Sequence, residues 1–166
     1  MTRLPLRVAC LLLALAPLTS AAQPGPVTVT PDAHGAALIT LPNGKITRVP
    51  KERGQVGISD PQSAADDRTV GWLVDYGVEG FSYPVAETLV IWRDGKVRRR
   101  FGTDQLFYSW AFHSRGEQVA FHTGPGHGEQ KSHCELHDIK TGRKVAEWDG
   151  DLESRDKPEW VAGLKH

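Results

Sequence analysis

Histidine and acidic side chains gather in one part of the sequence. Residues 122–137 hold four of the seven histidines of the chain. Alternate residues of an extended strand share a face, so His133, Glu135 and His137 are expected on one side and Cys134 on the other. Imidazole and carboxylate groups suit zinc, copper or nickel, which makes this face a candidate metal site.

A second strand can add a further ligand to this face. If the strand that ends near residue 123 pairs with the one that begins near residue 132, His122 is placed across from His133. Residues two apart on a strand are about 6.6 Å apart, so a compact site needs such a partner. The alternative is a solvated polar face. We expect no cofactor, and zinc or another divalent transition metal is the alternative.

Three aromatic residues lie in a loop rich in glycine between two expected strands. Residues 75–84 contain Tyr76, Phe81 and Tyr83, and we predict that they form a binding surface, because rigid aromatic rings make large contacts at a small entropic cost. The alternative is that the rings fold over the core as a lid.

A basic segment and the missing catalytic motifs bear on the kind of function. Arg98, Arg99 and Arg100, with Arg93 and Lys96, form a basic hairpin that is either a solvated strand or a contact for an anionic polymer. The sequence lacks Gly-x-Ser-x-Gly, a Walker loop and His-Glu-x-x-His. We therefore favour a protein that is not an enzyme.

The elements that position these residues repeat along the chain. Residues 38–46, 89–97 and 136–145 each read as strand, turn and strand, and Asn43-Gly44 and Asp94-Gly95 are two-residue hairpin signals. Strand patterns at 68–74 and 117–123 precede the last two. Residues 60–101 and 108–149 therefore form two units of about four strands, and residues 27–50 form an N-terminal hairpin.

The repeats are similar to a known kind of blade. Residues 112–121 and 136–148, the latter with Thr141-Gly142, resemble the WD40-like, TolB-type repeats of β-propellers. That resemblance implies four-stranded antiparallel blades, and the whole chain also resembles small secreted bacterial proteins. Two units and a hairpin are too few to close a propeller ring. We predict an all-β fold in which these units pack as stacked sheets.

The N-terminal residues predict export. Arg3 and Arg7 precede an apolar stretch over residues 8–16, and small residues at 20–22 suit cleavage before Gln23. Residues 1–22 are thus a signal peptide and residues 23–166 a single all-β domain, periplasmic or secreted, without a membrane span. Cys10 leaves with the leader, so Cys134 remains alone, buried and unreactive.

The net charge of the chain bears on its partners, and the apolar pattern of its strands predicts its core. The chain carries 20 basic and 20 acidic residues, which argues against a nucleic-acid partner. We predict an interaction module for an envelope or secreted protein; the alternative is a metal-binding protein or metal-dependent enzyme that uses the histidine cluster. The strand patterns place a set of five residues in the core: Trp72, Trp110, Val119, Phe121 and Leu136.

Overall fold

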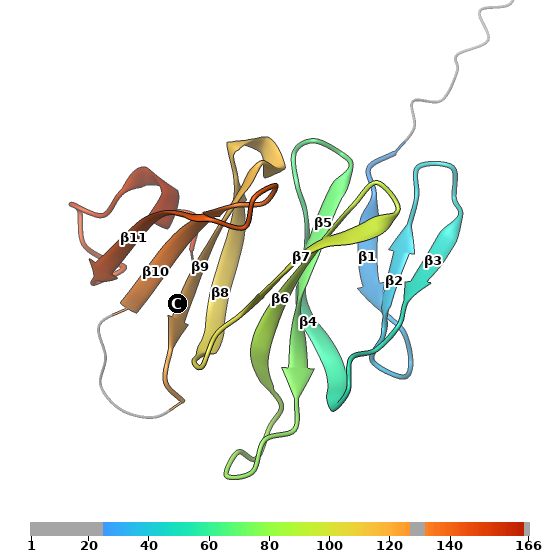
Figure 1. Cartoon of the computed structure of the whole chain (residues 1–166), viewed down its shortest axis with the longest axis horizontal. Helices are drawn as coiled ribbons and strands as arrows, with labels where there is room; N and C mark the ends of the chain where they lie inside the picture. Colours follow the sequence, from blue (N-terminus) through green and yellow to red (C-terminus); the bar gives the residue numbers. More distant parts are fainter. Residues whose placement is uncertain (1–24, 127–131, 165–166) are drawn as a thin grey trace, which may run out of the picture.

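Three antiparallel β-sheets lie side by side in the computed structural model, which describes residues 25–126 and 132–164 (Figure 1). The predicted leader lies outside the described residues. Sheet A contains β1 (Thr28–Pro31), β2 (Ala37–Thr40) and β3 (Ile46–Val49). Sheet B contains β4 (Gln55–Ser63), β5 (Thr69–Tyr76), β6 (Val85–Arg93) and β7 (Lys96–Gly102). Sheet C contains β8 (Leu106–His113), β9 (Gln118–Gly124), β10 (Ser132–Asp138) and β11 (Lys144–Gly150).

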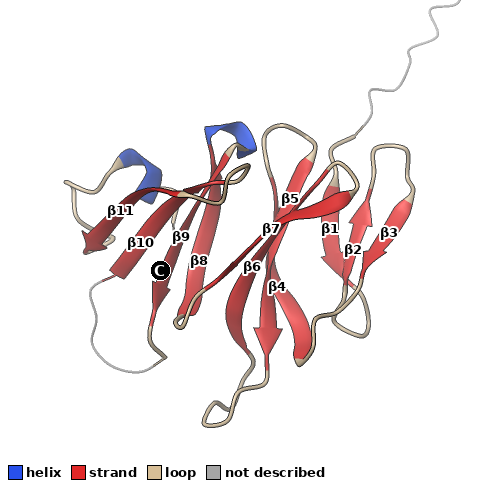
Figure 2. Ribbon diagram, viewed as in Figure 1, coloured by secondary structure: helices blue, strands red, loops and turns tan. Residues whose placement is uncertain are grey.

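The predicted fold class is confirmed. Sheets B and C are the two expected four-stranded units, and neighbouring strands in each follow one another along the chain. Sheet A holds the expected hairpin and one strand more, because β1 pairs with β2. Two short 3₁₀ turns, η1 (Ser114–Gly116) and η2 (Glu159–Val161), complete the regular structure (Figure 2). Within the described ranges, none of the helices has the length and apolar character needed to span a bilayer.

The two glycine turns differ in geometry. Asp94 and Gly95 have φ angles of 53° and 84°, the positive pair that a type I′ hairpin turn requires. At Asn43-Gly44, only Gly44 has a positive φ, and the Leu41 amide donates to the Lys45 carbonyl oxygen. The prediction of a two-residue turn there is wrong, because the hairpin closes around a three-residue loop.

Apolar side chains fill each space between neighbouring sheets. Sheet B is buried on both faces, which explains the unbroken apolar runs in β5 and β6. Its residues toward sheet A include Val70, Trp72, Val74 and Trp92. Its residues toward sheet C include Leu73, Leu89, Ile91 and Phe101, which meet Phe107, Trp110, Val119 and Phe121. The five predicted core residues are all buried, which confirms that set.

Trp110 shows how closely sheets B and C approach each other. A Cβ atom at Gly71 of β5 would lie 2.7 Å from the Trp110 ring, so only glycine leaves room for it. The Trp110 indole N–H donates to the carbonyl oxygen of Asp60, 3.1 Å away. One large side chain therefore packs against one strand of sheet B and hydrogen-bonds to another.

The outer face of sheet C is covered by the segment that follows β11. Leu152, Val161 and Leu164 of this segment pack on Cys134 and Leu136. Cys134 is buried as predicted, and burial raises the pKa of its thiol to about 11. The thiol is therefore protonated at neutral pH and is a poor nucleophile.

Candidate functional site

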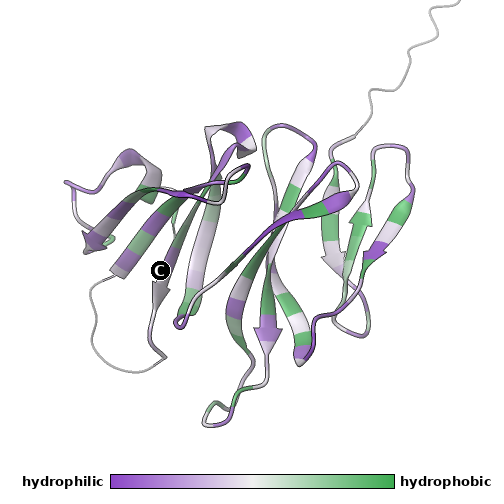
Figure 3. Ribbon diagram, viewed as in Figure 1, coloured by the Kyte–Doolittle hydropathy of each residue, from purple (hydrophilic) through white to green (hydrophobic). Residues whose placement is uncertain are grey.

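The histidine face forms a hydrogen-bonded network on β10. The Glu135 carboxylate lies between two imidazoles, with its Oε1 3.2 Å from His133 Nε2 and its Oε2 2.7 Å from His137 Nε2. Lys144 of β11 adds a third donor, with Nζ 3.0 Å from Glu135 Oε1. Alternation along β10 therefore brings together the three residues that the sequence predicted on one face. The ribbon of this strand alternates between hydrophilic and hydrophobic residues (Figure 3).

Within the network, the negative charge of Glu135 and the positive charge of His133 stabilise each other. Burial by itself would raise the pKa of Glu135, but hydrogen bonds from His137, Lys144 and His133 outweigh it and lower this pKa to about 2. The pKa of His133 is raised, chiefly by its Nδ1 contact of 2.6 Å with Asp149 Oδ1 and also by Glu135, against the effect of burial. The network therefore favours an ionised Glu135 beside a protonated His133.

His137 joins this network to the core between sheets B and C. Its ring stacks on Phe121 of β9, with centroids 5.0 Å apart and planes at 22°, and it meets the edge of Phe101 of β7 at 5.1 Å. Its Nδ1 lies 3.2 Å from the carbonyl oxygen of Gly142. Both ring nitrogens thus face oxygen acceptors while the ring packs between two sheets.

His122 does not belong to this network. The β9–β10 register places it across from Cys134, and His133 lies across from Thr123. The prediction that His122 is opposite His133 is therefore wrong by one residue, and in a strand this places the side chain on the other face. There the His122 ring packs against Tyr108 of β8, with centroids 5.1 Å apart.

The same geometry bears on the metal site that the sequence predicted as an alternative. Across residues 25–126 and 132–164, no group of three or more His, Cys, Asp and Glu side chains is arranged to hold a metal ion. The three residues that do meet, His133, Glu135 and His137, bond to one another and to Asp149 and Lys144. The arrangement is that of an ion network that fixes the end of β10 to β11 and to sheet B.

The predicted aromatic surface divides into two parts. Tyr76 belongs to β5, packs against the core between sheets A and B, and donates its hydroxyl to Glu52 Oε2 at 2.8 Å. Phe81 and Tyr83 lie in the β5–β6 loop, with ring centroids 6.0 Å apart in an edge-to-face contact. Tyr83 is 62% exposed. Tyr76 is thus part of the folded core, and the other two form a loop surface.

Tyr108 also belongs to that surface, although the sequence pattern did not predict it. It is 49% exposed, and its hydroxyl donates to the carbonyl oxygen of Pro125 at 2.5 Å. Phe81 packs on the neighbouring Gly126, where an added Cβ would lie 2.3 Å from the ring. Pro125 and Gly126 therefore bring the loop of sheet B and the start of β8 together.

We name Phe81, Tyr83 and Tyr108 the aromatic end. The exposure of Tyr108 accompanies a register irregularity between Phe107 and Ser109, which simple strand alternation does not predict.

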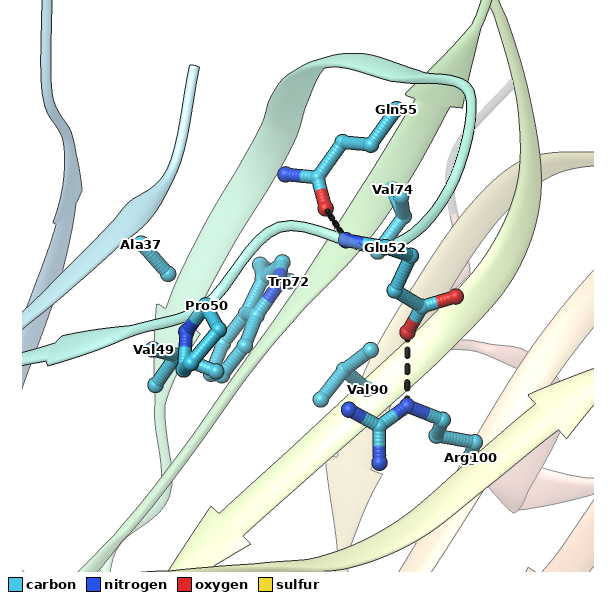
Figure 4. Close-up of a pocket in the computed structure, with 9 residues that line it drawn as sticks. All are labelled: Ala37, Val49, Pro50, Glu52, Gln55, Trp72, Val74, Val90 and Arg100. Atoms are coloured by element: carbon cyan, nitrogen blue, oxygen red, sulfur yellow. Dashed lines mark hydrogen bonds and ion pairs between the residues drawn. The ribbon is translucent and has the colours of Figure 1, made fainter. Parts of the chain in front are cut away.

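A small hollow between sheets A and B has no room for a ligand larger than water. Trp72 and Val90 are among the residues that line it, and Arg100 Nε bonds to Glu52 Oε1 at 2.6 Å beside them (Figure 4). The Glu52 amide donates to Gln55 Oε1 at 2.9 Å. The space among these side chains admits about one water molecule. Arg100 of the basic hairpin is therefore part of a structural ion pair.

A polar cleft lies beside the irregular strand β4. The pairing of β4 with β5 shifts between Ser59 and Gln62, and Asp60 within this bulge has a φ of 44°. Gln62 Nε2 donates to the carbonyl oxygen of Trp110 at 2.9 Å, which ties the bulge to β8. Ser109 Oγ is buried nearby with no hydrogen-bond partner among the described residues. An unpaired buried hydroxyl lowers stability.

Comparison with known proteins adds no family to this picture. No protein-family model matches the chain, and no curated protein matches it in sequence. The resemblance to propeller-blade repeats therefore stays a prediction, and the site must be interpreted from its own geometry.

Proposed function

We propose that the chain is an extracytoplasmic, non-enzymatic binding module that contacts a partner protein through its aromatic end. The observation that carries this proposal is the exposure of two large aromatic side chains at one end of the sheets, Tyr83 at 62% and Tyr108 at 49%. Single exposed apolar residues are common, but aromatic side chains that gather on one surface are typical of protein interfaces.

The aromatic end is held in place before any partner arrives. Phe81 is fixed on Gly126, Tyr83 meets the Phe81 ring, and Tyr108 is held by Pro125 and by the His122 ring. Side chains that are already ordered lose little entropy on binding. Tyrosine also combines a large apolar ring with a polar hydroxyl, which is why it is enriched among residues that dominate binding energy.

The rest of the chain supports a scaffold role and an extracytoplasmic location. The three sheets share cores on both faces of sheet B, so the β5–β6 loop extends from a rigid base. Binding residues are often found on loops that are held in position by a rigid scaffold of this kind. The predicted leader at residues 1–22 supports export, and the thiol of Cys134, buried and protonated, suits an oxidising compartment.

Photo-crosslinking tests this proposal in exporting cells. A photoreactive phenylalanine analogue replaces Tyr83 in one variant and Ile46 in a matched control, because Ile46 is 60% exposed on sheet A. We expect a discrete protein adduct from position 83 that position 46 does not give. The adduct must also be lost when the Tyr108→Ala change is added. Equal adducts from both positions, or none from position 83, would contradict the proposal.

A further inference from the structure

Another hollow lies at the opposite end of the sheets from the aromatic end. It is a cleft of about 360 Å³ lined by residues of the β6–β7 hairpin of sheet B and of the β8–β9 and β10–β11 turns of sheet C. These turns lie at the end of the sheets away from the β5–β6 loop (Figure 1). Four cationic and two anionic side chains line it: Arg93, Arg98, Arg99, Lys140, Asp94 and Glu117. The chain as a whole is close to neutral, so this positive surplus is local.

Two of the four cations are balanced by carboxylates. Arg93 bonds to Glu117 Oε1 and to Asp66 Oδ2, each at 3.1 Å, and only 18% of its side chain is exposed. Arg98 lies 3.3 Å from Asp94 Oδ2 and is 36% exposed. Arg93 is thus a structural residue of the cleft wall. Arg98 makes a longer contact and keeps donors that face solvent.

The other two cations have no carboxylate partner within 4 Å among the described residues. Arg99 donates instead to backbone carbonyl oxygens, with Nε 2.9 Å from Ile139 O and a second nitrogen on Lys140 O. Lys140 takes part in no salt bridge in the described part of the chain. The nearby Asp138 carboxylate accepts hydrogen bonds from Thr141, at 2.6 Å from its amide and 2.7 Å from its hydroxyl. Asp138 also interacts electrostatically with Lys140 and Arg99, which lowers its pKa, but it pairs closely with neither. Part of the positive charge of Arg99 and Lys140 therefore remains available to a ligand.

We propose that this cleft binds the carboxylates of an acidic peptide segment. Arg98 and Lys140 would donate to the carboxylates, and Arg99 would add its charge while it holds the two sheets together. The carboxylates of Asp94 and Glu117 oppose a compact, highly charged ion such as phosphate. Asp94 already pairs with Arg68 at 2.6 Å and Glu117 with Arg93, so each would use a remaining acceptor position for a peptide amide that flanks an acidic side chain. This site uses other residues and another end of the sheets than the aromatic end, so it goes beyond the proposed function.

Peptide binding tests this inference directly. A fluorescent peptide of alternating glutamate and glycine is titrated with the full exported chain by anisotropy, and the same peptide with glutamine in place of glutamate is the reference. We expect the glutamate peptide to bind more tightly, and its affinity to fall with added salt. The Arg98→Ser, Lys140→Ser variant should lose at least tenfold in affinity. The matched Lys45→Ser, Arg53→Ser variant removes two exposed cations near sheet A and should stay within twofold.

Each contrary result overturns the inference in a different way. Equal binding of the two peptides would show that carboxylates are not recognised. Equal losses in the two double variants would show attraction by overall charge instead of a site. Displacement of the peptide by submillimolar inorganic phosphate would show a site for small anions. Tyr83→Ala should leave this affinity unchanged, so failure here is distinguishable from failure of the aromatic end.

Discussion

Replacing Glu135 by glutamine should remove a measurable part of the stability at neutral pH. The pKa of Glu135 is lowered from 4.5 to about 2 in the folded chain, and its side chain is only 18% exposed. At 1.36 kcal/mol per pKa unit, that difference corresponds to about 3 kcal/mol. Because the folded-state pKa is the lower one, this stability is present above pH 4.5 and is lost as the pH falls toward 2. We therefore expect Glu135→Gln to cost about 3 kcal/mol at pH 7 and about 1 kcal/mol at pH 3.

Urea unfolding of the unmodified chain and of Glu135→Gln at pH 7 and pH 3 measures both expected losses in the free energy of unfolding. Glu147→Gln is the matched control, because Glu147 also contacts Lys144 but is 57% exposed, and it should cost under about 1 kcal/mol at either pH. The reasoning is refuted if Glu135→Gln leaves the free energy of unfolding unchanged at pH 7. An identical cost at pH 7 and pH 3 would also refute it, because the loss would then come from packing instead of charge.

The remaining predictions concern the core at Phe121, the buried hydroxyl of Ser109 and the binding of zinc. Phe121→Ala should lower the free energy of unfolding by about 3–5 kcal/mol, because the ring is 1% exposed between sheets B and C; a cost under about 1 kcal/mol would contradict that packing. Ser109→Ala should raise stability by up to about 1 kcal/mol, since the hydroxyl has no partner in the described residues; a clear loss in urea unfolding would reveal a hidden bond. Zinc at tens of micromolar should leave the melting temperature unchanged; a rise of several degrees that His133→Ala with His137→Ala abolishes would establish a metal site.

Local sequence signals were enough to predict sheets B and C and the hairpin of sheet A, but not the added strand β1. The Asp94-Gly95 pair fixes a type I′ turn by its two positive φ angles, and the apolar runs of β5 and β6 follow from burial on both faces. The Asn43-Gly44 signal was less specific, because a glycine with positive φ also closes a three-residue loop. Dipeptides therefore predict that a hairpin forms more reliably than they predict its loop length.

The site was less predictable, because it depends on register. Alternation within β10 was enough to place His133, Glu135 and His137 on one face, since that requires only one strand. The position of His122 depends on how β9 pairs with β10, and a shift of one residue moved it to the other face. Contacts between units, such as Arg99 with the carbonyl oxygen of Ile139, join residues 40 positions apart and leave no local signal.

The affinity of the crosslinked partner for the purified chain tests the proposed binding function most directly. Isothermal titration of that partner would compare the unmodified chain with Tyr83→Ala and with Ile46→Ala, a control of similar exposure. We predict that Tyr83→Ala weakens binding at least tenfold, as expected for an aromatic residue central to an interface, and that Ile46→Ala changes it less than twofold. Equal affinities for the unmodified chain and Tyr83→Ala would contradict the assignment of the aromatic end as the binding surface.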